Sequence, residues 1–137
     1  MVNRVLFETE YWRIELNSDQ AYLGRCVVVL KRECGELSGM SEEEMKDFLV
    51  VVKKIEGTMK KVFGAVMFNW TCMMNNAYKE NDEVAQVHFH VRPRYDEKVE
   101  FGGEVFEDGE FGPHYDNYRR EIASDKVLGE IVSALGG

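Results

Sequence analysis

The segment over residues 86–94 alternates polar and apolar side chains with the two-residue period of a β-strand. One face is apolar and suited to packing on a core, with Val87, Phe89 and Val91. The other face carries an amide, two imidazoles and a guanidinium, from Gln86, His88, His90 and Arg92. This polar row adds little to stability, but its side chains are good hydrogen-bonding partners for phosphate. We therefore expect a strand with one buried and one chemically active face. Pro93 is expected to end it, because proline has no N–H for the ladder.

The clearest helical signal begins at Ser41. Ser41 and Glu44 have the spacing of a capping box, and Gly64 is a typical C-terminal stop. Apolar residues recur between them at three- and four-residue spacing, at Met45, Phe48, Leu49, Val52, Ile55, Met59, Val62 and Phe63. A shorter C-terminal helix is expected after Ser124, with a stripe formed by Val127, Leu128, Ile131, Val132 and Leu135.

Strands are expected before and between these helices. Residues 5–16 indicate two short strands or one bent strand, and residues 26–30 form a β-branched run typical of a strand buried on both faces. Residues 66–74 indicate a further strand. Residues 95–120 are expected to be irregular, with the Glu-rich stretch 97–110 as a solvated loop. The sum is an α+β domain with an antiparallel sheet of about five strands, one long helix and a shorter C-terminal helix.

Composition narrows the class of protein. The 137 residues are 45% hydrophobic, which suits one compact domain over residues 1–137. The N-terminus lacks the apolar stretch of a signal peptide, and no apolar run is long enough to cross a membrane. The three cysteines show no CxxC pairing, so we expect a reducing, cytoplasmic environment and no membrane partner. The net charge of −8 disfavours nucleic acid as a partner, although local donors can still hold a small anion.

The His-x-His pair has three interpretations. His88 and His90 could be two structural histidines with satisfied hydrogen bonds. They could chelate a metal ion with a third ligand, such as His114 or a carboxylate. They could also perform phosphate chemistry, with one imidazole as nucleophile and the other as proton donor. Gln86 and Arg92 favour the third interpretation, because they bind phosphate well and metals poorly. His114 itself lies in a Gly-Pro turn.

The segment resembles the motif of the histidine triad (HIT) family, His-x-His-x-His, often followed by Pro-Arg. Here the motif reads Gln86-x-His88-x-His90, followed by Arg92-Pro93-Arg94. The resemblance implies that His88 is the nucleophile that becomes nucleotidylated and that His90 contacts the phosphate. Gln86 replaces the first histidine, which looks like the diadenosine-polyphosphate-hydrolase-like branch.

The resemblance covers about residues 5–95 and implies further contacts. Asn75 matches a phosphate-contacting residue of the family, and Asn17 matches the residue that holds the ribose hydroxyls. The candidate catalytic residues are therefore His88, His90 and Gln86, and the candidate substrate-binding residues are Asn17, Asn75 and Arg92. The family's phosphate contacts just before the motif are not carried over, because this chain has residues 81–83 as Asn-Asp-Glu and the carboxylate of Glu83 would repel a phosphate.

The implied activity is cleavage of a nucleoside phosphoanhydride or phosphoramidate at the α-phosphorus through a nucleotidyl-histidine intermediate. His88 would need its second ring nitrogen fixed, as by a backbone carbonyl, to set its tautomer. Gln86 cannot shuttle a proton, which favours a good leaving group. A purine nucleotide substrate and a homodimer are implied, with no required cofactor or metal, although magnesium could accompany a polyphosphate. The alternatives are a nucleotide-binding module with little turnover, or a metal-dependent enzyme using His88 and His90.

Overall fold

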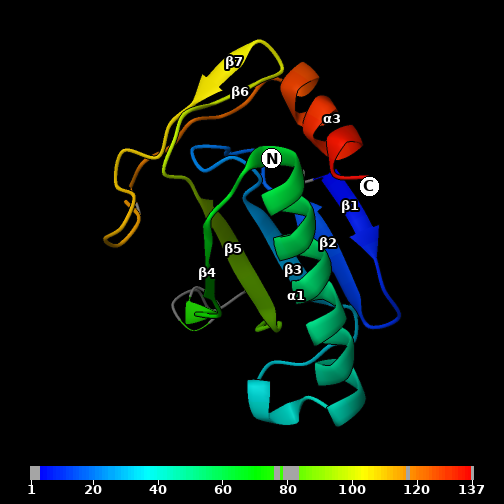
Figure 1. The fold of residues 1–137 in the computed structure, drawn as a ribbon. Helices are drawn as coiled ribbons and strands as arrows, with labels where there is room; N and C mark the ends of the chain where they lie inside the picture. The colour runs from blue at the N-terminus through cyan, green and yellow to red at the C-terminus, as the bar shows by residue number, and fades with distance from the viewer. Residues whose placement is uncertain (1–3, 76–77, 79–83, 117, 137) are drawn as a thin grey trace.

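The computed structural model describes residues 4–75, 78, 84–116 and 118–136. Its centre is a five-stranded antiparallel sheet in the order β1-β2-β3-β5-β4, with the long helix α1 across one face (Figure 1). The strands of this sheet are β1 Arg4–Glu8, β2 Trp12–Leu16, β3 Cys26–Leu30, β4 Met67–Thr71 and β5 His88–Arg94. The other elements are η1 Leu37–Gly39, α1 Glu42–Phe63, β6 Val99–Phe101, β7 Glu104–Phe106 and α3 Asp125–Ala134. This arrangement confirms the expected α+β fold.

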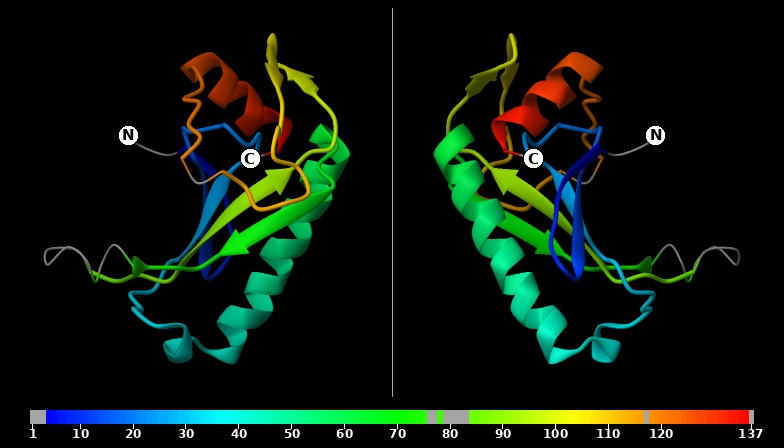
Figure 2. Two further views of the ribbon diagram at one scale, coloured as in Figure 1. Left: turned by 90° about the vertical axis from the view of Figure 1, so that its left-hand side faces the viewer. Right: turned by 90° about the vertical axis from the view of Figure 1, so that its right-hand side faces the viewer.

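The β6–β7 hairpin and α3 lie at one end of the sheet, while η1 and the start of α1 lie at the other (Figure 2). Residues 5–16 form two strands, β1 and β2, joined as a hairpin. The core lies between the sheet and α1, where Trp12, Ile14, Val28 and Val91 have no exposed surface. Buried apolar area of this kind is the main stabilising contribution to the fold. No helix in the described part of the chain is long and apolar enough to cross a membrane.

Helix α1 begins and ends where its caps predict. The Ser41 side chain accepts the Glu44 N–H at 3.1 Å, and the Glu44 carboxylate accepts the Ser41 N–H at 2.8 Å. Gly64 ends the helix in the left-handed region at φ +79°, which glycine adopts without the usual steric cost. The buried face of α1 is formed by Glu44, Val51, Ile55, Met59 and Phe63.

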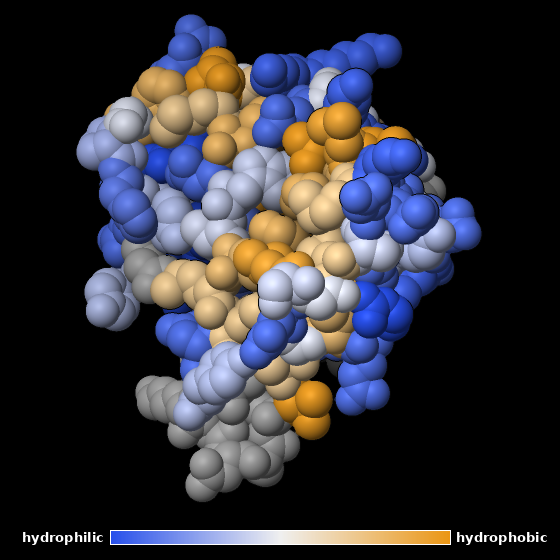
Figure 3. All heavy atoms as spheres, turned by 90° about the horizontal axis from the view of Figure 1, so that it is seen from below, coloured by the Kyte–Doolittle hydropathy of each residue, from blue (hydrophilic) through white to orange (hydrophobic). Residues whose placement is uncertain are grey.

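The expected apolar stripe of α1 is only partly correct. Met45, Leu49 and Val62 were expected in the core but are exposed, whereas Val51 is completely buried. The sheet covers only one side of the helix, and apolar residues on the neighbouring side therefore remain at the surface. Apolar side chains gather between charged ones at the end of the molecule where α1 begins (Figure 3).

Two further expectations were wrong. Pro93 does not end its strand, since β5 continues to Arg94. The pairing of β5 with β3 ends at Cys26 opposite Val91, so Pro93 lies beyond that ladder and is paired only with β4. The Glu-rich stretch is not simply a solvated loop, because it contains the β6–β7 hairpin.

The β6–β7 hairpin is packed against the rest of the fold. Its turn is Gly102-Gly103, with φ values of +62° and +80°. Both values lie in the region that two-residue hairpin turns require. The ring of Phe101 packs edge-on against Phe63 of α1 at 5.2 Å, and Phe106 is buried. Widely spaced aromatic residues therefore anchor a segment whose overall composition is polar.

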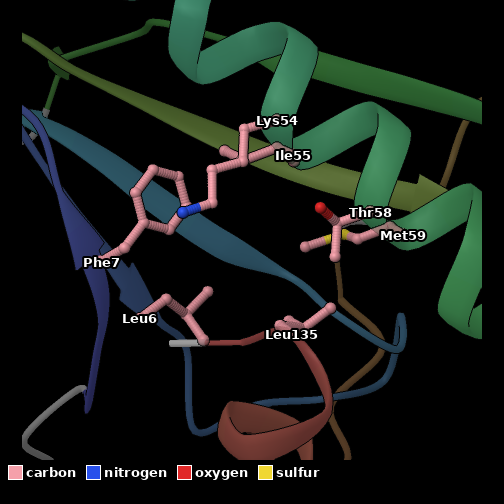
Figure 4. A pocket seen from close by; sticks show the side chains of 7 residues that line it. All are labelled: Leu6, Phe7, Lys54, Ile55, Thr58, Met59 and Leu135. Atoms are coloured by element: carbon pink, nitrogen blue, oxygen red, sulfur yellow. The ribbon is translucent and has the colours of Figure 1, made fainter.

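A small apolar hollow lies between β1, α1 and the end of α3 (Figure 4). It is lined mainly by Leu6, Phe7, Ile55, Met59 and Leu135. The Lys54 ammonium lies over the Phe7 ring at its edge, 4.0 Å from the ring centroid. This hollow is on the α1 face of the sheet and contains none of the residues that the sequence marks as functional.

Glu44 makes the stability of the fold vary with pH in the acid range. Hydrogen bonds from the Arg32 guanidinium, and then from the Ser41 N–H, lower the pKa of its carboxyl from 4.5 to about 2. The resulting stabilisation is present above about pH 4.5 and is lost as the pH falls towards 2. We expect Glu44→Gln to cost about 1–3 kcal/mol of unfolding free energy at neutral pH and much less in acid.

Urea unfolding of both proteins across this pH range would measure the difference. Glu42→Gln, which changes an exposed acid of the same first turn, is the matched control and should cost only about 0.3–1 kcal/mol. A cost for Glu44→Gln that is the same at neutral and acid pH would contradict this assignment.

Candidate active site

The polar face of the sheet lies opposite α1 and carries the histidines. Phe89 of β5 points to the α1 side and packs on Phe48 at 4.6 Å, and Val91 is completely buried there. His88, His90 and Arg92 therefore lie on the other face, as the alternation predicts. Their neighbours in the flanking strands follow from the register. Val29 is opposite His88 and Val27 is opposite His90 in β3, while Thr71 is opposite His90 and Asn69 is opposite Arg92 in β4.

The tautomer of His88 is fixed by the main chain. Its Nδ1 lies 2.8 Å from the carbonyl oxygen of Gln86. A carbonyl can only accept a hydrogen bond, so Nδ1 carries the proton and Nε2 carries the lone pair. The backbone carbonyl expected from the sequence is therefore present. His88 is only partly buried, which leaves a nucleophilic nitrogen on the polar face of the sheet.

His90 is held as a neutral imidazole. Its ring lies 5.1 Å from that of His88 and nearly perpendicular to it, at 83°. Burial, followed by repulsion from His88, Arg25 and Arg92, lowers the pKa of His90 to about 4. Its Nδ1 is buried and has no hydrogen-bond partner among the described residues. His90 can therefore donate one N–H to a phosphate oxygen at neutral pH without carrying a charge.

The side chain of Gln86 is hydrogen-bonded to the main chain. It precedes β5, and its amide Nε2 donates to the carbonyl oxygens of Leu30 and Arg32, both at 2.7 Å. Its Oε1 accepts the N–H of Cys34 at 3.0 Å. Both N–H groups of the amide are thus engaged by main-chain oxygens. Gln86 joins the end of β3 to the start of β5 and presents the carbonyl that orients His88.

The other candidate residues lie around the histidines at different depths. Arg92 is beside His90 and only 6% exposed, so it is not a solvent-exposed arginine. Asn17 lies at the end of β2, where its N–H donates to the Arg25 carbonyl at 3.0 Å and its Oδ1 accepts the Asp19 N–H. Asn75 is exposed and follows β4. Residues 81–83, which include Glu83, lie outside the described residues.

His114 stays in its turn. It is exposed, and its Nδ1 lies 2.6 Å from the Tyr115 carbonyl. Across the described ranges, no group of three or more His, Cys, Asp or Glu side chains is arranged to hold a metal ion.

Sequence reasoning missed two residues of this face, Arg25 and Tyr115. Arg25 directly precedes β3 and is ion-paired with Asp19 at 2.9 Å. Its position in phase with Val27 and Val29 was a signal that could have placed it on the polar face. Tyr115 packs its ring under the Arg92 guanidinium at 4.1 Å. No local pattern marks that contact, because it joins β5 to the distant C-terminal segment.

Comparisons with known proteins agree with this geometry. The HIT domain family model matches residues 2–97. An uncharacterised HIT-like protein of Methanocaldococcus jannaschii is 31% identical over 128 residues, covering 93% of this chain and 88% of the relative. An adenosine 5'-monophosphoramidase of Saccharomyces cerevisiae is 27% identical over 93 residues, covering 68% of this chain and 55% of that protein.

The fold is also shared with solved structures. A histidine triad protein of Sinorhizobium meliloti superposes with a TM-score of 0.72 at 14% identity, covering 98% of this chain and 87% of that one. The match of the family model to most of the chain, together with the His88 and His90 geometry, leads to one conclusion. This protein is a member of the HIT domain family.

Proposed function

We propose that this protein is a nucleotide hydrolase or transferase that cleaves a nucleoside phosphoanhydride or phosphoramidate at the α-phosphorus. The observation that carries the proposal is the hydrogen bond between His88 Nδ1 and the Gln86 carbonyl. It leaves Nε2 as the nitrogen that carries the lone pair of the neutral His88 ring, beside a neutral His90. The phosphoramidase activity named for the yeast relative is of the same chemical class.

The reaction is a double displacement. The lone pair on His88 Nε2 forms a bond to the α-phosphorus, and the bond to the leaving group breaks with its electron pair. Water then attacks the phosphorus, the N–P bond breaks, the electron pair returns to Nε2, and one proton of the water is released. A second nucleophile in place of water would make the protein a transferase.

Donors around the α-phosphate would stabilise the charge that develops on its oxygens. His90 can supply one N–H. Arg92 lies on the same face two residues further along β5, where it would contact a part of the substrate beyond the α-phosphate. Asn75 and Asn17 are the further proposed contacts, to phosphate and to the ribose hydroxyls. Donors that are fixed before the reaction contribute most when the site excludes water.

The hydrogen bonds of Gln86 favour a leaving group that departs as a stable anion. Its amide has no titratable proton, and both N–H groups are engaged by Leu30 and Arg32. A polyphosphate can leave without protonation, so a purine dinucleoside polyphosphate such as diadenosine tetraphosphate is the preferred substrate class. Magnesium would then be carried by the substrate. An amine leaving group must gain a proton, so a phosphoramidate is the second candidate.

We also propose a homodimer. Among the described residues, β4 is at the edge of the sheet and pairs with β5 alone, so its outer edge offers backbone groups for pairing. Three exposed apolar residues of α1 lie close together in its first half, namely Met45, Leu49 and Val50. A hollow next to them is lined by Met40, Met45 and Leu49. A second copy of the chain would cover this apolar surface.

The proposed activity is tested by the release of mononucleotide. Diadenosine tetraphosphate and an adenosine phosphoramidate are incubated with the protein in chelator and then in magnesium. We expect His88→Ala to reduce release by about 1,000-fold or more, because the N–P intermediate can no longer form. His114→Ala, which changes an exposed histidine in a turn, should leave release unchanged. Unaltered release by His88→Ala would overturn the mechanism.

Nucleotide binding without any product from the unaltered protein would instead identify a binding module. A trapped covalent adduct on wild-type protein, labile in acid and absent from His88→Ala, would identify the nucleophile directly.

A second prediction concerns the leaving group. Gln86→His should raise the ratio of phosphoramidate to dinucleotide cleavage, because histidine can supply the proton that an amine needs. The variant should also lose about 1–3 kcal/mol of unfolding free energy, since the Cys34, Leu30 and Arg32 main chains lose a partner. Steady-state rates with both substrates would measure the ratio. An unchanged ratio would mean that proton supply at this position does not limit the reaction.

The neutral His90 gives a third prediction. The unfolded chain binds a proton at this histidine below about pH 6.5, whereas the folded protein does so only near pH 4. The folded state is therefore destabilised as the pH falls from 6.5 to 4. The loss is at most about 3 kcal/mol. His90→Asn should remove this part of the pH dependence, and His114→Asn should not. Chemical unfolding at several pH values would test it, and an identical pH profile for wild type and His90→Asn would contradict it.

A further inference from the structure

A pair of arginines lies on the polar face just beyond His90. The register that places Cys26 opposite Val91 brings the preceding residue, Arg25, opposite Arg92. Arg25 is 9% exposed and Arg92 is 6% exposed, so both residues are buried. Their charges face each other across two paired strands, beside the imidazole of His90.

The pair has too little negative charge around it. The carboxylate of Asp19 lies 2.9 Å from Arg25 and also 3.6 Å from Arg120, so one acid serves two guanidiniums. The contact of Arg92 is the face of the Tyr115 ring, which carries no net charge. Buried cations are costly unless they are paired. In accord with this, burial lowers the pKa values of both arginines, and repulsion from Arg92 lowers that of Arg25 further.

Buried polar atoms without hydrogen bonds accompany this excess of positive charge. Arg25 Nε and His90 Nδ1 are buried and have no hydrogen-bond partner among the described residues. Within the same part of the chain, the guanidinium of Arg92 contacts the Tyr115 ring rather than an acceptor atom. Buried polar atoms in folded proteins are nearly always hydrogen-bonded, so this cluster of exceptions requires an explanation.

Arg94 shows what a structural arginine looks like in the same strand. It is completely buried, and its guanidinium donates five hydrogen bonds. The acceptors are oxygen atoms of Asp108, Asn69, Pro113 and Glu110. Two residues earlier, Arg92 is also buried, at 6% exposure, but lacks these partners among the described residues. The fold can satisfy a buried arginine here, and it does so for Arg94 but not for Arg92.

We propose that Arg25 and Arg92, beside His90, form a subsite for a second phosphoryl group of the bound nucleotide. That the ligand is a nucleotide rests on the proposed function. Arg92 is two residues from His90 and four from His88, or roughly 7 Å and 13 Å along the strand. The phosphorus that His88 attacks therefore cannot also be the main ligand of Arg92. Two guanidiniums match the charge and the acceptor geometry of a phosphate dianion.

The surroundings favour a phosphate on the ribose. Asn17, the proposed ribose contact, donates its N–H to the carbonyl of Arg25 and is its cross-strand neighbour. A phosphate on the 2'- or 3'-hydroxyl of a ribose held there would lie close to the arginines. The β-phosphate of a polyphosphate chain presents the same chemistry and is the other source. The subsite thus selects nucleotides with two separated phosphoryl groups over simple mononucleotides.

The subsite can be tested without turnover by measuring ligand affinities of the His88→Ala variant by calorimetry. The ligands are AMP, ADP, adenosine 2',5'-bisphosphate and adenosine 3',5'-bisphosphate. We expect at least one doubly phosphorylated ligand to bind about tenfold or more tightly than AMP. Arg92→Leu and Arg25→Leu, each made in this background, should remove that gain and leave AMP affinity within about threefold. A gain with a bisphosphate identifies a ribose phosphate as the source, and a gain with ADP alone identifies the β-phosphate.

Two control variants separate the subsite from other effects. Arg13→Leu removes a cation of the same face that is paired with Glu15, and it should keep the gain if the effect is local. Tyr115→Leu removes the ring while keeping both guanidiniums, and it should also keep the gain. Equal loss in Tyr115→Leu and Arg92→Leu would show that Arg92 only holds the C-terminal segment in place, and would overturn the proposal.

Other outcomes also decide the matter. The proposal is wrong if no doubly phosphorylated ligand gains affinity over AMP. Arginine-dependent binding of inorganic phosphate alone, without any gain for a nucleotide, would overturn it as well. If mononucleotide is released but no doubly phosphorylated ligand binds more tightly than AMP, the proposed function stands and the subsite proposal is wrong. An arginine-dependent gain in affinity, in a protein that shows no turnover, leaves the subsite intact and overturns the proposed function.

Discussion

The site depends on the alternation of side chains along β5, which is hydrogen-bonded on both sides, to β3 and to β4. A shift of one residue would send the histidines into the core and Val91 to the surface. The burial of Val91 and the packing of Phe89 on Phe48 prevent this. The same apolar contacts that stabilise the sheet therefore fix His88, His90 and Arg92 on one face. Gln86 adds a second constraint by tying the entry of β5 to the end of β3.

Local patterns predicted the parts of the fold whose causes are local. The capping box of Ser41 and Glu44, the buried run of β3 and the cap at Ser124 each depend on a few neighbouring residues, and all are present. The β6–β7 hairpin and the strand position of Pro93 could not be predicted in this way. They depend on contacts with distant elements, such as Phe101 on Phe63 and the point at which β3 stops pairing with β5.

The same distinction between local and long-range contacts applies to the candidate site. The proximity of His88 and His90 and the main-chain bond that fixes His88 follow from strand geometry and imidazole chemistry. The engagement of Gln86 with Cys34, and the packing of Tyr115 on Arg92, join residues far apart in the chain. A sequence shows which side chains are on a face, but only the assembled fold shows which hydrogen-bonding groups are already used. For Gln86, only the fold shows that both N–H groups of its amide are engaged by main-chain carbonyls.

The contrast between Arg92 and Arg94 extends this reasoning from structure to function. Both arginines are buried in one strand, so their desolvation costs are similar. Arg94 recovers that cost through two hydrogen bonds to the Asp108 carboxylate and three to other oxygens. Arg25 instead shares the single carboxylate of Asp19 with Arg120, and Arg92 contacts the Tyr115 ring. A fold that keeps such an arrangement sacrifices stability in the free protein, which a dianion would restore on binding. In a chain of net charge −8, local burial of cations is the physical means by which an anion can be held at all.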